Sequence, residues 1–136
     1  MLCTLHVDAE VRDMEFSRNI LQGKDVLIVA AGSKVTLFHI VGSEDGSTFN
    51  GFLLHEHKMP IHFKEEGGAS LHPSGQKFIA GGSDLWVRVF DTTTGEELEC
   101  HRGHHGPIRC LRYAPNGETY ATGSEDGTIR LWKTNL

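Results

Sequence analysis

The sequence predicts an all-β protein built from a repeated unit. Short apolar runs alternate with Gly, Asn, Asp and Ser along the chain, which is the pattern of strands separated by tight turns. Sixteen glycines against four prolines in 136 residues fit a fold with many such turns. No segment keeps a capped helical period, so helices are not expected. An internal repeat is the third and strongest observation.

The repeat has a period of 42 residues, which is in the range of a four-stranded β-propeller blade. Shifting the sequence by this period superimposes identical turn residues and similar strand residues. The identical pairs are Pro73/Pro115, Gly75/Gly117, Gly81/Gly123, Asp84/Asp126 and Arg88/Arg130. The similar pairs are Phe78/Tyr120, Val87/Ile129, Val89/Leu131 and Phe90/Trp132.

Twelve strands are expected, in chain order. The first part of the chain supplies 2–6, 11–16, 26–31, 34–40 and 51–55, with breaks at Gly32-Ser33 and at the polar, Gly-rich segment 42–47. The middle unit supplies 68–72, 77–82, 86–91 and 96–101. The last unit supplies 107–113, 118–124 and 128–133. Within the two later units, Pro-Ser-Gly or Pro-Asn-Gly marks the first turn and an Asp marks the second.

The strands group into about three four-stranded blades of a larger β-propeller ring. Residues 2–6 are the outer strand of a preceding blade, 7–58 form a degenerate blade, 59–102 form a blade, and 103–136 form a blade without its outer strand. Known rings close with about 4–8 blades, so we expect this partial propeller to be part of a larger polypeptide or to need another copy. Open strand edges predict that the isolated chain self-associates.

The last unit resembles the WD-repeat consensus in Gly103-His104, in 107–113 and in 121–132. The resemblance implies a buried hydrogen-bonded chain formed by His104, Ser124, Asp126 and Trp132, in which Thr122 can replace Ser124. Such a network is stable only when every member is paired. The middle unit has Gly82 and Phe90 in place of Ser and Trp, so it retains only Asp84.

A Ser/His/Asp catalytic triad is the alternative reading of the same residue types. No Gly-rich elbow and no oxyanion-hole motif accompanies them, and the Asp lies in a tight turn. We therefore expect a structural network and no enzyme.

At a finer level the chain resembles the C-terminal blades of the serine/threonine kinase receptor-associated (unr-interacting) family. The resemblance rests on 26–29, 37–39, 69–73, 80–82, 95–99 and 103–108. It implies a seven-bladed ring and a non-catalytic protein-interaction scaffold of the cytoplasm and nucleus. That scaffold acts in ribonucleoprotein assembly with the survival-motor-neuron complex and in transforming-growth-factor-β signalling. A WD-repeat subunit of a translation initiation factor complex is the alternative, and a propeller hydrolase is a weaker one.

Composition argues against several partner classes. The net charge of −5 and the absence of a Lys/Arg cluster disfavour direct nucleic-acid binding. No apolar run is long enough to span a membrane, and the start of the chain lacks the features of a signal peptide. Three cysteines without metal-ligand spacing favour reduced thiols. No cofactor is expected.

Histidines offer a metal reading, which we weigh against ordinary surface roles. His55 and His57 share a face of one strand, and His101, His104 and His105 cluster further along. No Cys or carboxylate spacing completes a zinc motif, so we expect no metal.

Partner binding is expected at the turns between the second and third strands of the blades. Trp86 is the principal candidate, because an exposed Trp is a frequent hot spot. Ser83, His105 and Glu125 are the other candidates. Packing between blades is the alternative role for Trp86. Glu96, Glu97 and Glu99 are read as a solvated outer strand rather than as an acidic docking strip.

Overall fold

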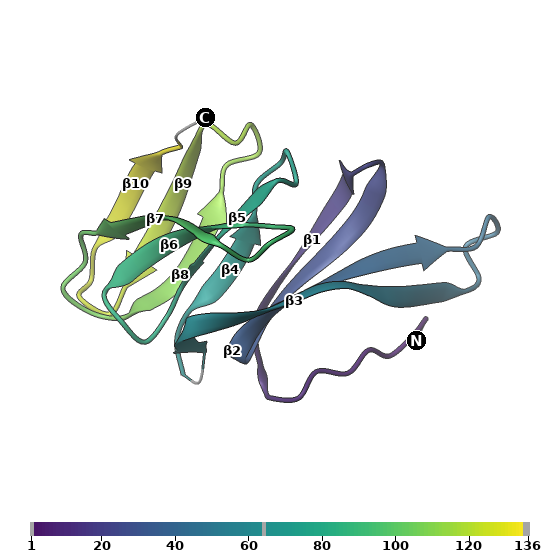
Figure 1. Ribbon diagram of the computed structural model, residues 1–136, viewed down its shortest axis with the longest axis horizontal. Helices are drawn as coiled ribbons and strands as arrows, with labels where there is room; N and C mark the ends of the chain where they lie inside the picture. The colour runs from purple at the N-terminus through teal and green to yellow at the C-terminus, as the bar shows by residue number, and fades with distance from the viewer. Residues whose placement is uncertain (1, 64, 135–136) are drawn as a thin grey trace.

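The computed structural model describes residues 2–63 and 65–134, and in these residues it shows ten strands and no helix. They form three antiparallel sheets, here called sheets A, B and C (Figure 1). Sheet A contains β1 (Val11–Leu21), β2 (Lys24–Gly42) and β3 (Phe49–Phe63). Sheet B contains β4 (Gly68–Leu71), β5 (Lys77–Gly81), β6 (Trp86–Asp91) and β7 (Glu97–Arg102). Sheet C contains β8 (Ile108–Tyr113), β9 (Thr119–Ser124) and β10 (Ile129–Lys133). The all-β prediction is confirmed.

Sheets B and C follow the predicted repeat closely. The equivalent aromatic pairs are cross-strand partners in both sheets: Phe78 lies opposite Phe90, and Tyr120 lies opposite Trp132. The strands in each sheet follow chain order, β4-β5-β6-β7 and β8-β9-β10. Consecutive strands joined by tight turns pair with each other, so local sequence is sufficient to set this register.

Sheet A differs from the expected four-stranded blade. The two strands predicted at 26–31 and 34–40 are a single long strand, β2, which turns near Gly32 (Figure 1). Gly32 has a φ of 61°, a left-handed value that favours glycine. The first part of β2 pairs with β1 and the second part pairs with β3, so pairing continues on both sides of the bend.

β3 also runs further than predicted, through the boundary drawn at residue 58 to Phe63. Met59, Ile61 and Phe63 are buried while Pro60 and His62 are exposed. This alternation is that of a strand with one face on a core. The buried side chains at the end of β3 share a core with residues of sheet B.

Residues 2–7 contain no strand, although an outer strand was predicted at 2–6. Instead Leu5 and Val7 pack against Val29, Ala31 and Phe38 on the outer face of sheet A. Burial of these apolar side chains helps to position the segment on sheet A.

The sheets stack side by side through their first strands. β4 contacts β1 and β2 on one side and β8 on the other. One core lies between sheets A and B, and a second lies between sheets B and C. The first includes Ile28, Leu37, Ile61, Phe63, Phe78 and Phe90, and the second includes Ile79, Val87, Val89, Ile108, Leu111 and Tyr120. In the part of the chain that is described, no helix is long and apolar enough to span a membrane.

Candidate functional site

A relay of hydrogen bonds links Trp132 to Asp126 through the last blade. The Trp132 indole N–H donates to Thr122 Oγ1 at 2.9 Å, and Thr122 Oγ1 lies 2.7 Å from His104 Nε2. On the other side of the ring, His104 Nδ1 lies 2.9 Å from Thr128 Oγ1, which donates to Asp126. Because the Thr128 hydroxyl donates to the carboxylate, it accepts from Nδ1–H, and Nε2 is left to accept from Thr122.

Ser124 lies outside this relay. Its hydroxyl donates to the carbonyl of Gly106 at 2.8 Å and accepts from the Asp126 N–H. Thr122, the alternative that the sequence allowed, supplies the hydroxyl between His104 and Trp132. A Ser/His/Asp triad would require the Ser124 hydroxyl to be directed at the imidazole. It is directed at a backbone carbonyl instead.

Asp126 also fixes the connection that enters the last blade. Its carboxylate accepts the Thr128 hydroxyl and the His105 N–H, the latter at 2.7 Å. These bonds hold the pKa of Asp126 well below its usual range, with the Thr128 hydroxyl as the largest cause. The carboxylate is therefore charged at neutral pH and joins two turns of sheet C.

Trp132→Phe is expected to lower the free energy of unfolding by about 1–3 kcal/mol, because Thr122 loses its donor in a half-buried site. Phe90→Trp in the middle blade is the matched control. Ala80 occupies the position of Thr122 there, so a new indole finds no hydroxyl and no comparable gain is expected. Urea melts of both variants test this. If Trp132→Phe leaves the free energy of unfolding unchanged, the relay does not contribute to stability.

The middle blade replaces the relay with ring stacking and ion pairs. The rings of Phe78 and Phe90 stack at 5.3 Å. Asp84 accepts the Trp86 N–H and pairs with Arg88, which also pairs with Glu97 at 2.9 Å. The turn that precedes Trp86 is therefore held from two sides.

Trp86 is half-buried, and two guanidinium groups lie over its ring. The Arg102 guanidinium is 4.0 Å from the indole centroid and that of Arg88 is 5.3 Å from it. Arg102 is exposed and lies across the strand pair from Trp86. Leu85, in the same turn, is 40% exposed. The indole thus supports an accessible cation and has an apolar neighbour at the surface.

The other predicted partner-binding residues lie in the same turn or in turns of the adjoining sheet C. Ser83 Oγ accepts from the His62 N–H at 3.2 Å. Glu125 pairs with Arg109 at 2.9 Å, and the His105 N–H donates to Asp126. The Ile108 N–H donates to the carbonyl of Gly82, so the turns of sheets B and C are joined at this end. We call this end, defined by 82–86, 102–109 and 124–127, the mouth.

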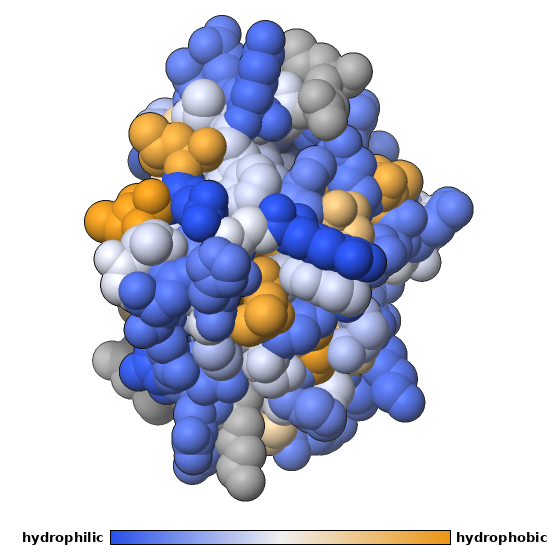
Figure 2. Space-filling view, turned by 90° about the vertical axis from the view of Figure 1, so that its left-hand side faces the viewer, coloured by the Kyte–Doolittle hydropathy of each residue, from blue (hydrophilic) through white to orange (hydrophobic). Residues whose placement is uncertain are grey.

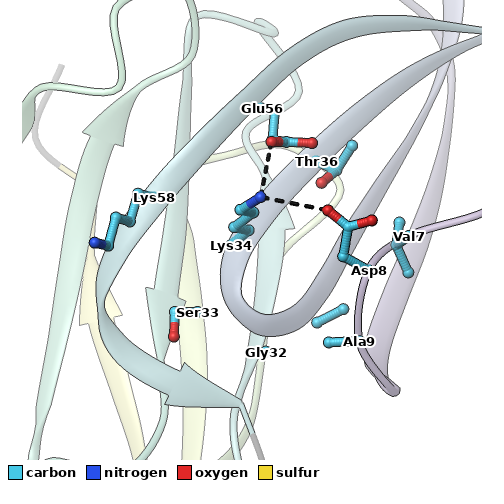
Figure 3. Close-up of a pocket in the computed structure, with 10 residues that line it drawn as sticks. Val7, Asp8, Ala9, Gly32, Ser33, Lys34, Thr36, Glu56 and Lys58 are labelled. Atoms are coloured by element: carbon cyan, nitrogen blue, oxygen red, sulfur yellow. Dashed lines mark ion pairs between the residues drawn. The ribbon is translucent and has the colours of Figure 1, made fainter.

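A pocket of about 310 Å³ lies beside the bend of β2, between residues 7–9 and β3 (Figure 3). Lys34 points into it and pairs with Glu56 at 3.1 Å and Asp8 at 3.6 Å. A smaller pocket shares Ala9 and Gly32 with it. Sequence reasoning missed both, because they depend on where residues 7–10 settle on sheet A.

Sequence reasoning also missed a charged network between the first strands of the three sheets. Glu15 on β1 accepts the Ser70 hydroxyl and the Leu71 N–H, both on β4, at 2.9 Å. Arg112 on β8 forms two bonds to Asp13, each of 2.7 Å. The Asp13 carboxylate raises the pKa of Arg112.

Ser70 is the centre of this network. It is fully buried, donates to Glu15 and accepts from the Tyr113 N–H at 3.0 Å. Asp13 approaches β4 so closely that a Cβ on Gly68 would lie 2.2 Å from its carboxylate. The residues are up to 99 positions apart, so no local pattern indicates the network.

The histidines of the metal reading have other neighbours. His57 Nε2 lies 2.6 Å from the Thr92 carbonyl, and its ring stacks on His55 at 5.6 Å. The His101 ring lies 5.7 Å from Trp132. Within residues 2–63 and 65–134, no three His, Cys, Asp or Glu side chains form a group that could hold a metal ion.

A known family matches the last part of the chain. The WD domain, G-beta repeat family matches residues 95–133. This match spans β7 to β10, and the three stacked antiparallel sheets are consistent with blades of a WD-repeat β-propeller.

The chain is similar along most of its length to serine-threonine kinase receptor-associated proteins. The protein of that name from Dictyostelium discoideum is 42% identical over 130 residues, which are 96% of this chain and 39% of that protein. The one from Rattus norvegicus is 38% identical over 131 residues, 96% of this chain and 33% of that protein. An mRNA export factor from Chaetomium thermophilum is 30% identical over 125 residues, 90% of this chain and 32% of that protein. The chain therefore spans well under half the length of these relatives.

Proposed function

We propose that the chain is a non-catalytic scaffold that binds other proteins at its mouth. The observation that carries the proposal is Trp86, which is half-buried and has two guanidinium groups over its ring, one of them from the exposed Arg102. Trp and Arg are enriched at interface hot spots, and a preformed arrangement costs little side-chain entropy on binding. The rigid sheets beneath provide the fixed support that such a surface needs.

The arrangement of Ser124 and His104 does not favour an enzyme. A hydrolase would need a nucleophile directed at a base, and Ser124 donates to a backbone carbonyl while His104 lies between two threonines. His104 is 4% exposed, and its ring nitrogens are both engaged. A structural role for these residues supports the scaffold.

We further propose a receptor-signalling partner, a serine/threonine kinase receptor of transforming-growth-factor-β type. Support for the receptor comes from the name of the relatives that are 38–42% identical, serine-threonine kinase receptor-associated protein. The survival-motor-neuron complex, which acts in ribonucleoprotein assembly, is the second proposed partner. The likeness to an mRNA export factor supports a role in RNA processing. We propose that the protein acts in the cytoplasm and nucleus, in keeping with either partner.

Calorimetric titration tests the proposal. The purified chain is titrated with the cytoplasmic domain of a serine/threonine kinase receptor, and separately with the purified survival-motor-neuron complex. Saturable binding to either, together with no turnover of ester, phosphate or glycoside substrates, is the expected result. The proposal fails if neither partner binds to a folded chain or if turnover is measured.

A further inference from the structure

The hairpin formed by β2 and β3 continues past the end of sheet B. β3 passes sheet B from the mouth, where the His62 N–H donates to Ser83, to the opposite end, where His57 Nε2 lies 2.6 Å from the Thr92 carbonyl. The residues that precede this contact in β3 therefore lie beyond sheet B. Figure 1 shows the hairpin extending away from sheets B and C. We call this extension, residues 38–53, the arm.

One face of the arm is covered by the start of the chain. Leu5 packs against the cluster that contains Phe38. Gly51 pairs with Ile40, and a Cβ on Gly51 would lie 2.5 Å from the Leu5 side chain. This face looks away from sheet B, because the cluster of Phe38 is separate from the core between sheets A and B.

The opposite face of the arm is open. His39 and Val41 alternate along β2 with Leu37, which is buried in the core between sheets A and B, so they face the side of sheet B. Phe52 lies opposite His39, with the two ring centroids 6.4 Å apart. Phe52 is 56% exposed and Val41 is 39% exposed. These side chains are exposed because the arm extends past the end of sheet B.

The outer edge of the arm is an unpaired strand edge. β3 is the last strand of sheet A, and within the described part of the chain no strand pairs with its outer edge. Proteins protect such edges with Pro and with charged side chains, Lys above all. The part of β3 beside sheet B has Lys58 and Pro60, whereas residues 49–53 have neither. The arm is therefore the part of β3 that is suited to accept another strand.

The outer strand of sheet B is protected in the usual way. β7 is short and contains the charged residues Glu97, Glu99 and Arg102. Figure 2, which views the side of the molecule that carries β7 and β10, shows hydrophilic side chains between small apolar groups. An unprotected edge is thus a property of the arm and not of every outer strand.

The tip of the arm is acidic and held in one shape. Asp45 accepts the hydroxyls of Ser43 and Ser47, each at 2.6 Å. The Ser43 hydroxyl is the largest cause that lowers the pKa of Asp45 to about 2, so this carboxylate is charged at neutral pH. Glu44 beside it is exposed, and residues 35–57 contain no Lys or Arg. A basic segment is the electrostatic complement of this surface.

We propose that the arm is a docking site for an extended basic segment of a partner protein, which adds to the outer edge of β3 at residues 49–53 as a further strand. In this mode of recognition, backbone hydrogen bonds along an open edge supply affinity and alternate side chains supply selectivity. Apolar side chains of the segment cover Phe52, and its Lys or Arg side chains lie near Glu44 and Asp45. The arm is at the opposite end of the blades from the mouth, so this partner is a second one.

Titration with a short capped peptide that alternates valine and lysine tests the proposal, with fluorescence anisotropy of the labelled peptide as the readout. Saturable binding is expected, and a matched peptide of valine and glutamate should not bind. Phe52→Ala should weaken binding about tenfold, because it removes the apolar anchor. Glu44→Lys should weaken it through charge repulsion. Leu98→Ala is the matched control, since Leu98 is 50% exposed on the protected strand β7, and it should leave binding unchanged.

Amide hydrogen exchange locates the contact. The bound peptide should slow exchange in residues 49–53 and leave residues 97–102 unchanged. The proposal is wrong if the valine–lysine peptide does not bind, if it protects other strands, or if folded Phe52→Ala binds it as tightly as the unmodified chain. Slower exchange in residues 49–53 as the protein concentration rises, without peptide, would assign the edge to a second copy and would also overturn it. Circular dichroism melts confirm that each variant is folded.

Discussion

Replacing Glu15 with alanine is expected to lower the free energy of unfolding by about 2–5 kcal/mol, although the residue lies in no apolar core. Its carboxylate accepts the hydroxyl of Ser70, which is fully buried, and the N–H of Leu71, which is 3% exposed. Each buried donor left without an acceptor costs roughly 1–3 kcal/mol. Arg112, which lies 3.4 Å from the same carboxylate, also loses a partner.

Urea denaturation measures the effect, with Glu44→Ala as the control. Glu44 is exposed in the segment between β2 and β3, so its replacement should change the free energy of unfolding by less than about 0.5 kcal/mol. Because Glu15 joins sheets A and B, its loss should also separate their unfolding transitions. Equal free energies of unfolding for the two variants would show that the network between the first strands does not hold the sheets together.

Gly67→Ala is expected to destabilise the protein by about 3–5 kcal/mol, the sum of backbone strain and overpacking. Gly67 has a φ of 106° in the connection between sheets A and B. A Cβ there would lie 2.4 Å from the carbonyl oxygen of Gly81 and 2.7 Å from the Cα of Gly82. Both are backbone atoms of sheet B and its turn, and they cannot yield as a flexible side chain would.

Gly46→Ala separates backbone strain from overpacking. Gly46 also has a positive φ, 73°, but a Cβ there has no atom within 4 Å. Its replacement should therefore cost only the backbone strain, about 1 kcal/mol. Thermal melts of the two variants give the comparison. Similar losses at both positions would contradict the close approach of the connection to sheet B.

Sheets B and C could be predicted from the sequence because their information is local. Turn residues such as Pro73 and Gly75 recur 42 positions later, and each turn joins strands that pair with each other. The alternation of apolar and polar residues along each strand then decides which face of the strand is buried, as for Val87 and Val89. Register and core follow from these two local rules.

The remaining features depend on contacts that the sequence does not encode locally. Gly32-Ser33 predicts a break, and only the pairing of β2 with strands on both sides makes it a bend. The sequence favoured Ser124 as the hydroxyl beside His104 and allowed Thr122 in its place, and the position of His104 selects Thr122. The network of Asp13, Glu15 and Arg112 exists only once three separate strands have come together. The partner-binding roles of Ser83, Trp86, His105 and Glu125 stay predictions.

The central claim, that the mouth of these blades binds a protein partner, is tested most directly by the affinity of Trp86→Ala. The receptor cytoplasmic domain, or whichever proposed partner binds the unmodified chain, is titrated against this variant and against Phe52→Ala. Phe52 is an aromatic residue that is 56% exposed on β3, outside the mouth. A loss of about 2 kcal/mol, roughly 30-fold in Kd, is predicted for Trp86→Ala, with a folded protein and no change for Phe52→Ala. Unchanged affinity of a folded Trp86→Ala at full partner occupancy would contradict the claim.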